Sequence, residues 1–387
     1  MPSSRVAALQ KSTIVRSFIL LERTAPAVGA RWAEALWFRI PGPSRRRDRL
    51  AEPGRPFQVR VHGRAVAGEA WGHPEAPAVY LVHGWGGWRW QLDGFVGPLV
   101  AAGFRVVTFD GPGHGESDPG PEGPGRSTIL ELADALAAVV AANGPAHAII
   151  AHSLGATATA YALDHGLKTG RLAFVSPMAD PLPYTRTFAG RLGFGERTRA
   201  RLVARIERRV GTSMAAFAVP AMASRVETPP LLLVHDRQDT ETSWSDSAAI
   251  ARSWPGARLI STTGLGHRRI LRDPAVVAEV AGFVAAASAP DEPGGPLLDL
   301  RGDALAGVDG GEQPRQLLQL AVDGVGQGAL QPVVDHPGDG GHGQGGAGGQ
   351  AGGQVGHGLV ELARRDQPVD HAEALGLGRG DGPAGGQ

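Results

Sequence analysis

The stretch that decides the fold is Ala146-His-Ala-Ile-Ile-Ala-His-Ser-Leu-Gly-Ala-Thr-Ala-Thr-Ala-Tyr-Ala-Leu163. Its apolar first part predicts a buried strand, and its alanine-rich second part predicts a helix. Ser153 therefore stands on a sharp turn between the two. Ala151 and Gly155 are small enough for this turn to close, which holds the serine hydroxyl above the sheet and beside backbone N–H groups at a helix N-terminus. An ordinary N-capping serine gives a similar short string, so this string alone does not distinguish a nucleophile from a helix cap. Motifs elsewhere in the chain are needed for that distinction.

Two earlier apolar runs predict buried strands that lead into glycine-rich turns. Residues 79–82 precede His83-Gly-Trp-Gly-Gly87, whose glycines let the backbone approach a ligand closely. Residues 105–109 precede Asp110-Gly-Pro-Gly-His-Gly-Glu-Ser117, which is too rich in glycine and proline for a helix or a strand.

Three later runs predict further strands, at residues 172–175, 231–234 and 257–260. The second of them leads into His235-Asp-Arg-Gln-Asp239, and the third is followed by Gly264-Leu-Gly-His267. A serine, then two aspartates, then a histidine thus each follow a predicted strand.

On these motifs, residues 56–287 resemble the α/β-hydrolase family, in which the triad runs in the order serine, acid, histidine. The resemblance implies an α/β fold with a mostly parallel central sheet, flanking helices and a small helical cap. The chain departs from the family pattern at Ala151, where the elbow usually carries glycine, and some lipase-like members show the same exchange. A serine at the elbow disfavours epoxide hydrolases and haloalkane dehalogenases, which carry aspartate there.

The resemblance implies a nucleophile, Ser153, a base, His267, and an acid, Asp239. A serine hydroxyl is a poor nucleophile until a base removes its proton, and the acid holds that base in one tautomer. The backbone N–H groups of Leu154 and Trp85 are the implied oxyanion hole.

Asp236 lies on the same turn as Asp239 and is the alternative acid. Asp239 occupies the position that the family uses, and Asp236 would then bond its own backbone within the turn.

The resemblance also implies a cap at about residues 177–228, between two predicted strands. Methionine and aromatic side chains suit a pocket for a hydrophobic acyl group, and the alternative for each is a place in the core. The residues expected in the pocket are Trp88, Met178, Met214, Phe217 and Met222.

We therefore expect a carboxylesterase or lipase-like serine hydrolase whose partner is a small-molecule ester with a hydrophobic acyl group. Thioesterase, amidase and C–C bond hydrolase activities use the same triad and remain alternatives. So does a catalytically silent binding protein on this fold, although its usual signature, loss of a triad member, is missing.

The composition restricts the classes of binding partner and of chemistry further. The formal net charge is zero and the pI is about 7.3, so no electrostatic argument supports nucleic acid binding. The chain has no cysteine, which excludes disulfides and thiol catalysis. No zinc or haem motif occurs, and neither a metal nor a cofactor is expected.

The first 55 residues carry 11 Arg or Lys against 4 Asp or Glu, and their apolar spacing predicts amphipathic helices that pack on the catalytic domain. Contact of these helices with a membrane surface is the alternative. Arg16 and Glu22 interrupt the apolar run, so neither a signal peptide nor a spanning helix is expected and the predicted compartment is the cytoplasm. The stretch from Pro41 to Arg47 predicts a linker, so that residues 1–55 form an extension and 56–288 the catalytic domain.

The last 99 residues, 289–387, contain only ten residue types, which are the ten that have codons beginning with G or C. A GC-rich gene carries its bias at the third codon position, and a shifted frame moves that bias to the first. We therefore interpret this tail as frame-displaced translation that is disordered, because it has no aromatic residue for a core. A glycine-rich linker or a metal-binding tract around His336 and His342 would leave the missing residue types unexplained.

Overall fold

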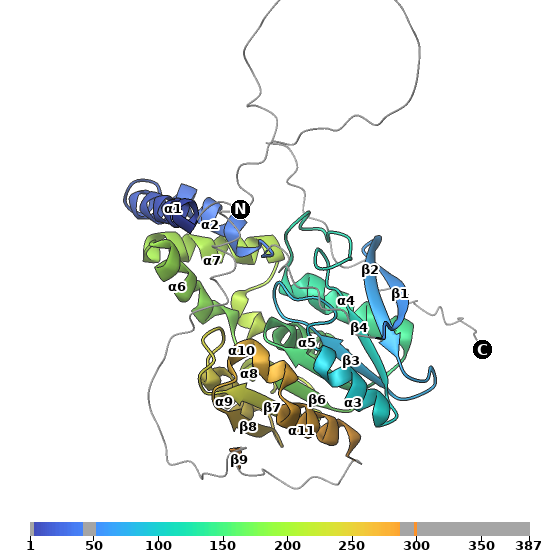
Figure 1. The fold of residues 1–387 in the computed structure, drawn as a ribbon. Helices are drawn as coiled ribbons and strands as arrows, with labels where there is room; N and C mark the ends of the chain where they lie inside the picture. Colours follow the sequence, from blue (N-terminus) through green and yellow to red (C-terminus); the bar gives the residue numbers. More distant parts are fainter. Residues whose placement is uncertain (1–3, 42–51, 287–297, 300–387) are drawn as a thin grey trace, which may run out of the picture. The chain divides into compact units, whose positions relative to one another are not determined.

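A computed structural model of the chain describes residues 4–41, 52–286 and 298–299 (Figure 1). The predicted tail, apart from two residues, and most of the predicted linker lie outside this part of the chain.

A twisted sheet runs through the described residues, with strand order β1-β2-β4-β3-β5-β6-β7-β8-β9. The hairpin β1–β2 and the pair β2–β4 are antiparallel, and all later neighbours are parallel. The strands are β1 Arg55–Val61, β2 Arg64–Trp71, β3 Ala78–Val82, β4 Arg105–Phe109, β5 Ala146–His152, β6 Leu172–Val175, β7 Leu231–Asp236, β8 Arg258–Thr262 and β9 Leu298–Asp299. The predicted fold class is confirmed, as are the strands expected from the apolar runs.

Helices cover both faces of the sheet. The longer ones are α1 Ser4–Thr24, α2 Pro26–Trp37, α3 Val96–Ala101, α4 Ile129–Asn143, α5 Leu154–Asp164, α6 Pro181–Leu192, α7 Glu196–Val210, α9 Trp244–Ser253 and α11 Pro274–Ala285. The short ones are η1 Asp93–Phe95, η2 Met214–Phe217, α8 Val219–Met222, α10 Gly266–Arg269 and η3 Ile270–Arg272. One hydrophobic cluster joins α4, α5, α8 and α9 to one face of the sheet, and a second joins α3 and α11 to the other.

The carboxyl ends of the parallel strands place the predicted motifs together. The turns after β3, β4, β5, β7 and β8 all leave the sheet at this edge. In open α/β sheets this edge is where ligands bind. The site is therefore expected between this edge and the helices that cover it.

The cover is formed by α6, α7 and η2 together with the two N-terminal helices (Figure 1). A third hydrophobic cluster joins these elements, and within it Phe18 of α1 stacks on Trp32 of α2 at 4.5 Å and packs against Phe194 at 5.2 Å. The N-terminal helices thus pack on the cap rather than directly on the sheet. Among the described residues, no helix combines the length and the apolar character needed to cross a membrane.

Candidate active site

Ser153 occupies a strained turn between β5 and α5. Its backbone angles are φ 55° and ψ −123°, a conformation that a residue with a side chain adopts at a cost of about 1–3 kcal/mol. The serine is 1% exposed, and its Oγ has no hydrogen-bond partner among the described residues. A strained, buried and unpaired hydroxyl is poorly explained by helix capping, and Ser153 indeed makes no side-chain capping bond.

Two glycines bring the loop after β3 against this turn. A Cβ at Gly84 would lie 3.0 Å from the Cβ of Ser153, and a Cβ at Gly155 would lie 2.5 Å from the carbonyl oxygen of His83. Only glycine fits so close an approach. The backbone N–H groups of Trp85 and Leu154, the predicted oxyanion hole, belong to the two segments that these glycines bring together.

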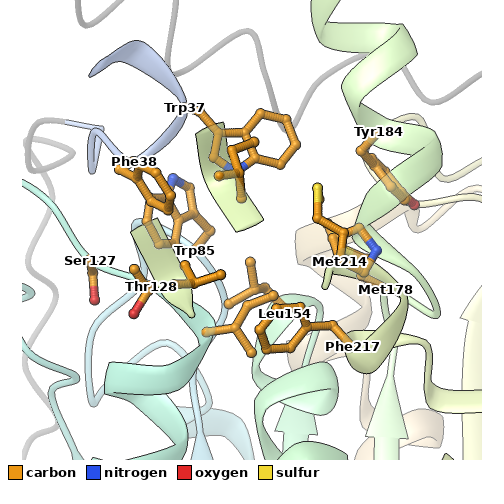
Figure 2. A pocket seen from close by; sticks show the side chains of 14 residues that line it. Trp37, Phe38, Trp85, Ser127, Thr128, Leu154, Met178, Tyr184, Met214 and Phe217 are labelled. Atoms are coloured by element: carbon orange, nitrogen blue, oxygen red, sulfur yellow. The ribbon is translucent and has the colours of Figure 1, made fainter. Parts of the chain in front are cut away.

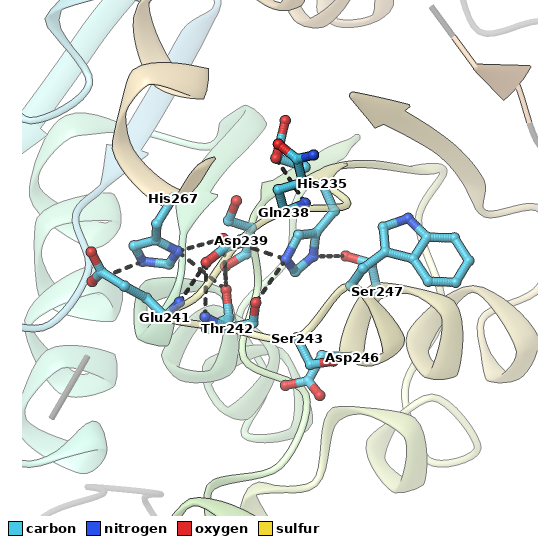
Figure 3. Close-up of polar contacts among 12 residues, drawn as sticks. His235, Gln238, Asp239, Glu241, Thr242, Ser243, Asp246, Ser247 and His267 are labelled. Atoms are coloured by element: carbon cyan, nitrogen blue, oxygen red, sulfur yellow. Dashed lines mark hydrogen bonds and ion pairs between the residues drawn. The ribbon is translucent and has the colours of Figure 1, made fainter. Parts of the chain in front are cut away.

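Asp239 and His267 are in direct contact, and Figure 3 shows the bond between them. Asp239 Oδ2 accepts from Nδ1–H of His267 at 2.7 Å, which favours the tautomer of the neutral imidazole that presents Nε2 as an acceptor. Burial would raise the pKa of Asp239, but hydrogen bonds from His235 and His267 outweigh burial and hold that pKa far below its usual range. The carboxylate is therefore ionised and fixes the tautomer of His267.

His267 also lies beside the serine turn. His152, the residue before Ser153, donates from Nε2 to the carbonyl oxygen of His267 at 3.0 Å, and the two rings are 4.5 Å apart. Burial, with a smaller contribution from His267, holds the pKa of His152 well below its usual value, so His152 is neutral. The structure thus brings the three predicted catalytic residues to one place, although no hydrogen bond joins Ser153 to His267 in it.

Asp236, the alternative acid, bonds other partners than His267. Its Oδ1 accepts from the backbone N–H of Gln238 at 2.9 Å, within its own turn. Its Oδ2 accepts from the Thr262 hydroxyl at 2.8 Å and from the Leu265 N–H at 2.9 Å. These bonds hold the segment that leads to His267, and none of them is made to the imidazole.

The sequence did not predict the residues other than His267 that contact the Asp239 carboxylate. The Thr242 hydroxyl lies 3.2 Å from Asp239 Oδ2, and the Thr242 N–H donates to Oδ1 at 3.0 Å. Nε2 of His235 lies 3.4 Å from Asp239 Oδ2, while Nδ1 of the same ring bonds the Ser247 hydroxyl at 2.8 Å. His235 lies within the predicted motif, but the spacing of the motif does not show which side chains its ring contacts.

Glu241 is a second carboxylate at the imidazole, on the side opposite Asp239. Its Oε2 lies 3.8 Å from Nε2 of His267, and its Oε1 lies 3.3 Å from Nε of Arg268. Glu241 is 6% exposed and was not predicted, because a lone glutamate in a loop carries no signal of its own. Across the described ranges, no three His, Cys, Asp or Glu side chains gather closely enough to hold a metal ion.

Buried charges fix the loop that carries Trp85. The guanidinium of Arg89 pairs with Asp110 at 2.7 Å, with Glu69 at 3.0 Å and with Glu116 at 2.6 Å. The backbone N–H of Arg89 also donates to Asp110 at 2.7 Å. The loop after β3 is thereby tied to β2 and to the loop after β4, so its N–H groups are held in place before any substrate binds.

An apolar pocket opens between the serine turn and the cap (Figure 2). Its volume is about 90 Å³, and its walls include Leu154 and Trp85 beside the predicted oxyanion hole. Met178, Met214 and Phe217 line it as predicted.

Two predicted pocket residues are not among those that line this pocket. Met222 lies in the core, because α8 packs between α5 and α9. Trp88 stands beyond the turn at Gly86, whose φ is +67°, so that Trp85 alone of the two faces the pocket.

Trp37 and Phe38 also line the pocket, although no sequence motif predicted them there. Tyr184 lines it too, and its hydroxyl donates to Asp246 at 2.9 Å. The amphipathic pattern predicted helices at the N-terminus, but a pattern on one segment does not say which distant cavity the segment completes.

Comparison with known families gives two matches. Residues 77–202 match the family model described as "alpha/beta hydrolase fold", and residues 212–295 match the one described as "TAP-like protein". Together the two matches span more than half of the chain and include all three predicted catalytic residues.

Comparison with individual proteins gives more distant matches. A curated relative from Danio rerio, named "Serine hydrolase-like protein", is 31% identical over 99 residues, which are 26% of this chain and 30% of that protein. A solved hydrolase from Pseudomonas aeruginosa PA01 is 23% identical with a TM-score of 0.45, over 62% of this chain and 100% of that one. A monoacylglycerol lipase from Paleococcus ferrophilus is 21% identical with a TM-score of 0.44, over 57% of this chain and 98% of that one.

Proposed function

Since this chain belongs to the α/β-hydrolase family, and is a hydrolase of that type, we propose that it cleaves a carboxylic ester through an acyl-enzyme on Ser153. The observation that carries the proposal is the 2.7 Å hydrogen bond between Asp239 and His267, formed beside a strained serine. A hydrogen-bonded acid and base next to an unpaired serine hydroxyl are the parts that serine hydrolysis needs.

The proposed reaction has two steps. The Oγ of Ser153 attacks the acyl carbon, its proton passes to Nε2 of His267, and the oxyanion accepts hydrogen bonds from the N–H groups of Leu154 and Trp85. His267 then gives the proton to the departing alkoxide, which leaves an acyl-enzyme and an alcohol. A water molecule attacks the acyl-enzyme by the same route in reverse and releases the carboxylic acid.

The surroundings of the imidazole support this sequence. Asp239 faces Nδ1 and stabilises the imidazolium that forms when His267 takes the proton. Glu241 lies 3.8 Å from Nε2, the atom that takes the proton in this sequence of steps. The pocket next to Leu154 is lined mainly by apolar side chains, which favours a hydrophobic acyl group.

Labelling with a fluorophosphonate tests the nucleophile. The probe should modify wild-type protein at Ser153 and should fail to modify Ser153→Ala. Ser176→Ala is a matched control, because Ser176 is also buried, has a positive φ of 47° and has an Oγ without a hydrogen bond in the described structure. Persistent labelling of Ser153→Ala would refute the assignment.

A substrate panel tests the reaction class. The panel pairs a nitrophenyl ester with a thioester and an amide of the same acyl group. We expect the ester to give the highest kcat/KM. A higher value for the thioester or the amide would assign one of those activities, and stoichiometric labelling without turnover on any of them would favour a binding protein.

A further inference from the structure

One wall of the pocket comes from outside the catalytic domain. Trp37 is the last residue of α2, and Phe38 follows it directly; both line the pocket. Figure 2 shows Trp37 at the end of the pocket opposite Leu154, with Phe38 beside Trp85. An acyl chain that starts at Ser153 and runs past Leu154 would therefore meet Trp37.

Polar contacts hold this wall on both sides. Before it, Glu34 of α2 is 5% exposed and pairs with Arg205 of α7 at 2.5 Å. After it, the Phe38 carbonyl accepts from the N–H of Ser127 at 3.2 Å, and the Ile40 N–H donates to the Gly125 carbonyl at 2.9 Å. The chain on either side of Trp37 is thus fixed to the cap and to the loop before α4.

Ring contacts fix the side chains themselves. Trp37 packs edge-on against Phe188 of α6, with the ring centroids 5.3 Å apart. Phe38 is 4% exposed, and the Arg209 guanidinium lies 5.4 Å from the centre of its ring. These ring contacts hold Trp37 and Phe38 in the positions where they line the pocket.

From this geometry we infer that the N-terminal extension sets the acyl-chain length, with Trp37 as the residue that stops the chain. A core cavity of about 150 Å³ takes a benzene molecule, so the 90 Å³ here fits an acyl group of about four carbons. The substrates are therefore esters of short straight-chain acids. The inference rests on the proposed esterase function, because it concerns the acyl group of that reaction.

The test is a chain-length series of nitrophenyl esters, from acetate to decanoate, with wild-type protein and Trp37→Ala. Wild-type kcat/KM should peak at or below butanoate and fall with each further pair of carbons. In Trp37→Ala the space of the indole becomes available, and each added methylene that is buried favours binding by about fourfold. The ratio of hexanoate to butanoate should rise by about tenfold or more.

Trp32→Ala is the matched control. It removes the same side chain from the same helix, but Trp32 stacks on Phe18 and does not line the pocket. It should leave the chain-length order unchanged. An unchanged order in a Trp37→Ala protein that still hydrolyses butanoate would overturn the inference, and so would an equal shift in Trp32→Ala, which would point to a loosened extension.

A binding measurement separates this inference from the proposed reaction. Calorimetric titration of 1-butanol, 1-hexanol and 1-octanol into Ser153→Ala, with and without Trp37→Ala, needs no turnover. The longer alcohols should gain affinity over butanol only when Trp37 is absent. If wild-type protein cleaves no ester, the proposed function fails, and the alcohol series still decides whether Trp37 limits chain length.

Discussion

At the scale of single residues, the site depends on side chains that are not interchangeable with their neighbours. Asp239 and Asp236 are three positions apart and the side chains of both are inaccessible to solvent, yet only Asp239 bonds His267. Asp236 bonds the Thr262 hydroxyl and the Leu265 N–H instead. The same residue type thus has two roles on one turn, one toward the imidazole and one toward the backbone that carries it.

This difference predicts unequal effects of two matched substitutions. Asp239→Asn should lower kcat by orders of magnitude, about 10⁴-fold in serine proteases, because the amide no longer favours the productive tautomer of His267. Asp236→Asn should lower kcat much less, because no hydrogen bond joins Asp236 to His267. Its amide nitrogen cannot replace the second oxygen, which accepts from a backbone N–H, so this variant should lose stability rather than the tautomer of His267. Steady-state kinetics on one ester gives both values, and the opposite ranking would move the acid to Asp236.

The sequence was sufficient for the residues that sit inside motifs and insufficient for those that reach the site through loop geometry. Ser153, Asp239 and His267 each follow a predicted strand, so parallel topology alone brings them to one edge. Thr242 and Glu241 reach the same imidazole because the loop after β7 folds back around Asp239, whose carboxylate accepts from the backbone N–H groups of both residues. No spacing rule encodes such a turn.

At the scale of elements, α1 and α2 are part of the cap rather than an appendage. Phe18 is fully buried between Trp32 and Phe194, in a cluster that joins the N-terminal helices to α6 and α7. Glu22 of α1 also accepts from the N–H of Thr198 at 3.1 Å, in the first turn of α7. The amphipathic pattern predicted the helices, but the partner of their apolar face became known only from the structure.

Two substitutions on α1 test this packing. Phe18→Ala should lower the free energy of unfolding by about 3 kcal/mol or more, since it leaves a cavity among aromatic rings. Leu20→Ala is the control two residues away: Leu20 is 61% exposed, and its loss should change stability by less than about 0.5 kcal/mol. Urea unfolding gives both differences, and equal small effects would show that the helices do not depend on the cap.

The hairpin of β1 and β2 is an element that the sequence pattern did not predict. Exposure alternates along residues 57–61 of β1, whereas residues 66–69 of β2 are continuously buried, and the sequence pattern marked only the start of this segment as a domain boundary. His62 and Gly63 both have positive φ, which suits a two-residue hairpin turn. The Phe57-Gln-Val-Arg-Val61 alternation was the signal available, and it was weaker than the continuous apolar runs of the buried strands.

At the scale of the whole molecule, the loops around the site contain buried histidines that must stay neutral. His83 donates from Nδ1 to the Gly84 carbonyl and accepts at Nε2 from the Gly111 N–H, so a second ring proton would remove an accepted bond. His114 likewise accepts at Nε2 from the Gly86 N–H. Burial lowers the pKa of His83, and burial with a contribution from His83 lowers that of His114 to about 3.

These low pKa values predict that acid destabilises the fold, beginning well above the pH at which carboxylates titrate. Between about pH 6.5 and pH 3, unfolded chains bind a proton at His114 that the folded chain excludes, so stability falls as the pH falls. The slope is about 1.4 kcal/mol per pH unit for each such histidine, or about 2 kcal/mol at pH 5. Asp239 contributes in the same direction, but only below about pH 4, where an unfolded aspartate takes up its proton.

Urea unfolding at several pH values between 7.5 and 5 isolates the histidines from the carboxylates. His114→Gln should have a shallower loss of stability over this range than wild type, by about 2 kcal/mol at pH 5 relative to pH 7.5, whatever its stability at neutral pH. His73→Gln is the control, because solvent reaches the His73 ring in the folded chain, and its curve should run parallel to that of wild type. If His114→Gln also runs parallel to wild type, His114 takes up its proton equally in both states, and the acid sensitivity of the fold must originate elsewhere.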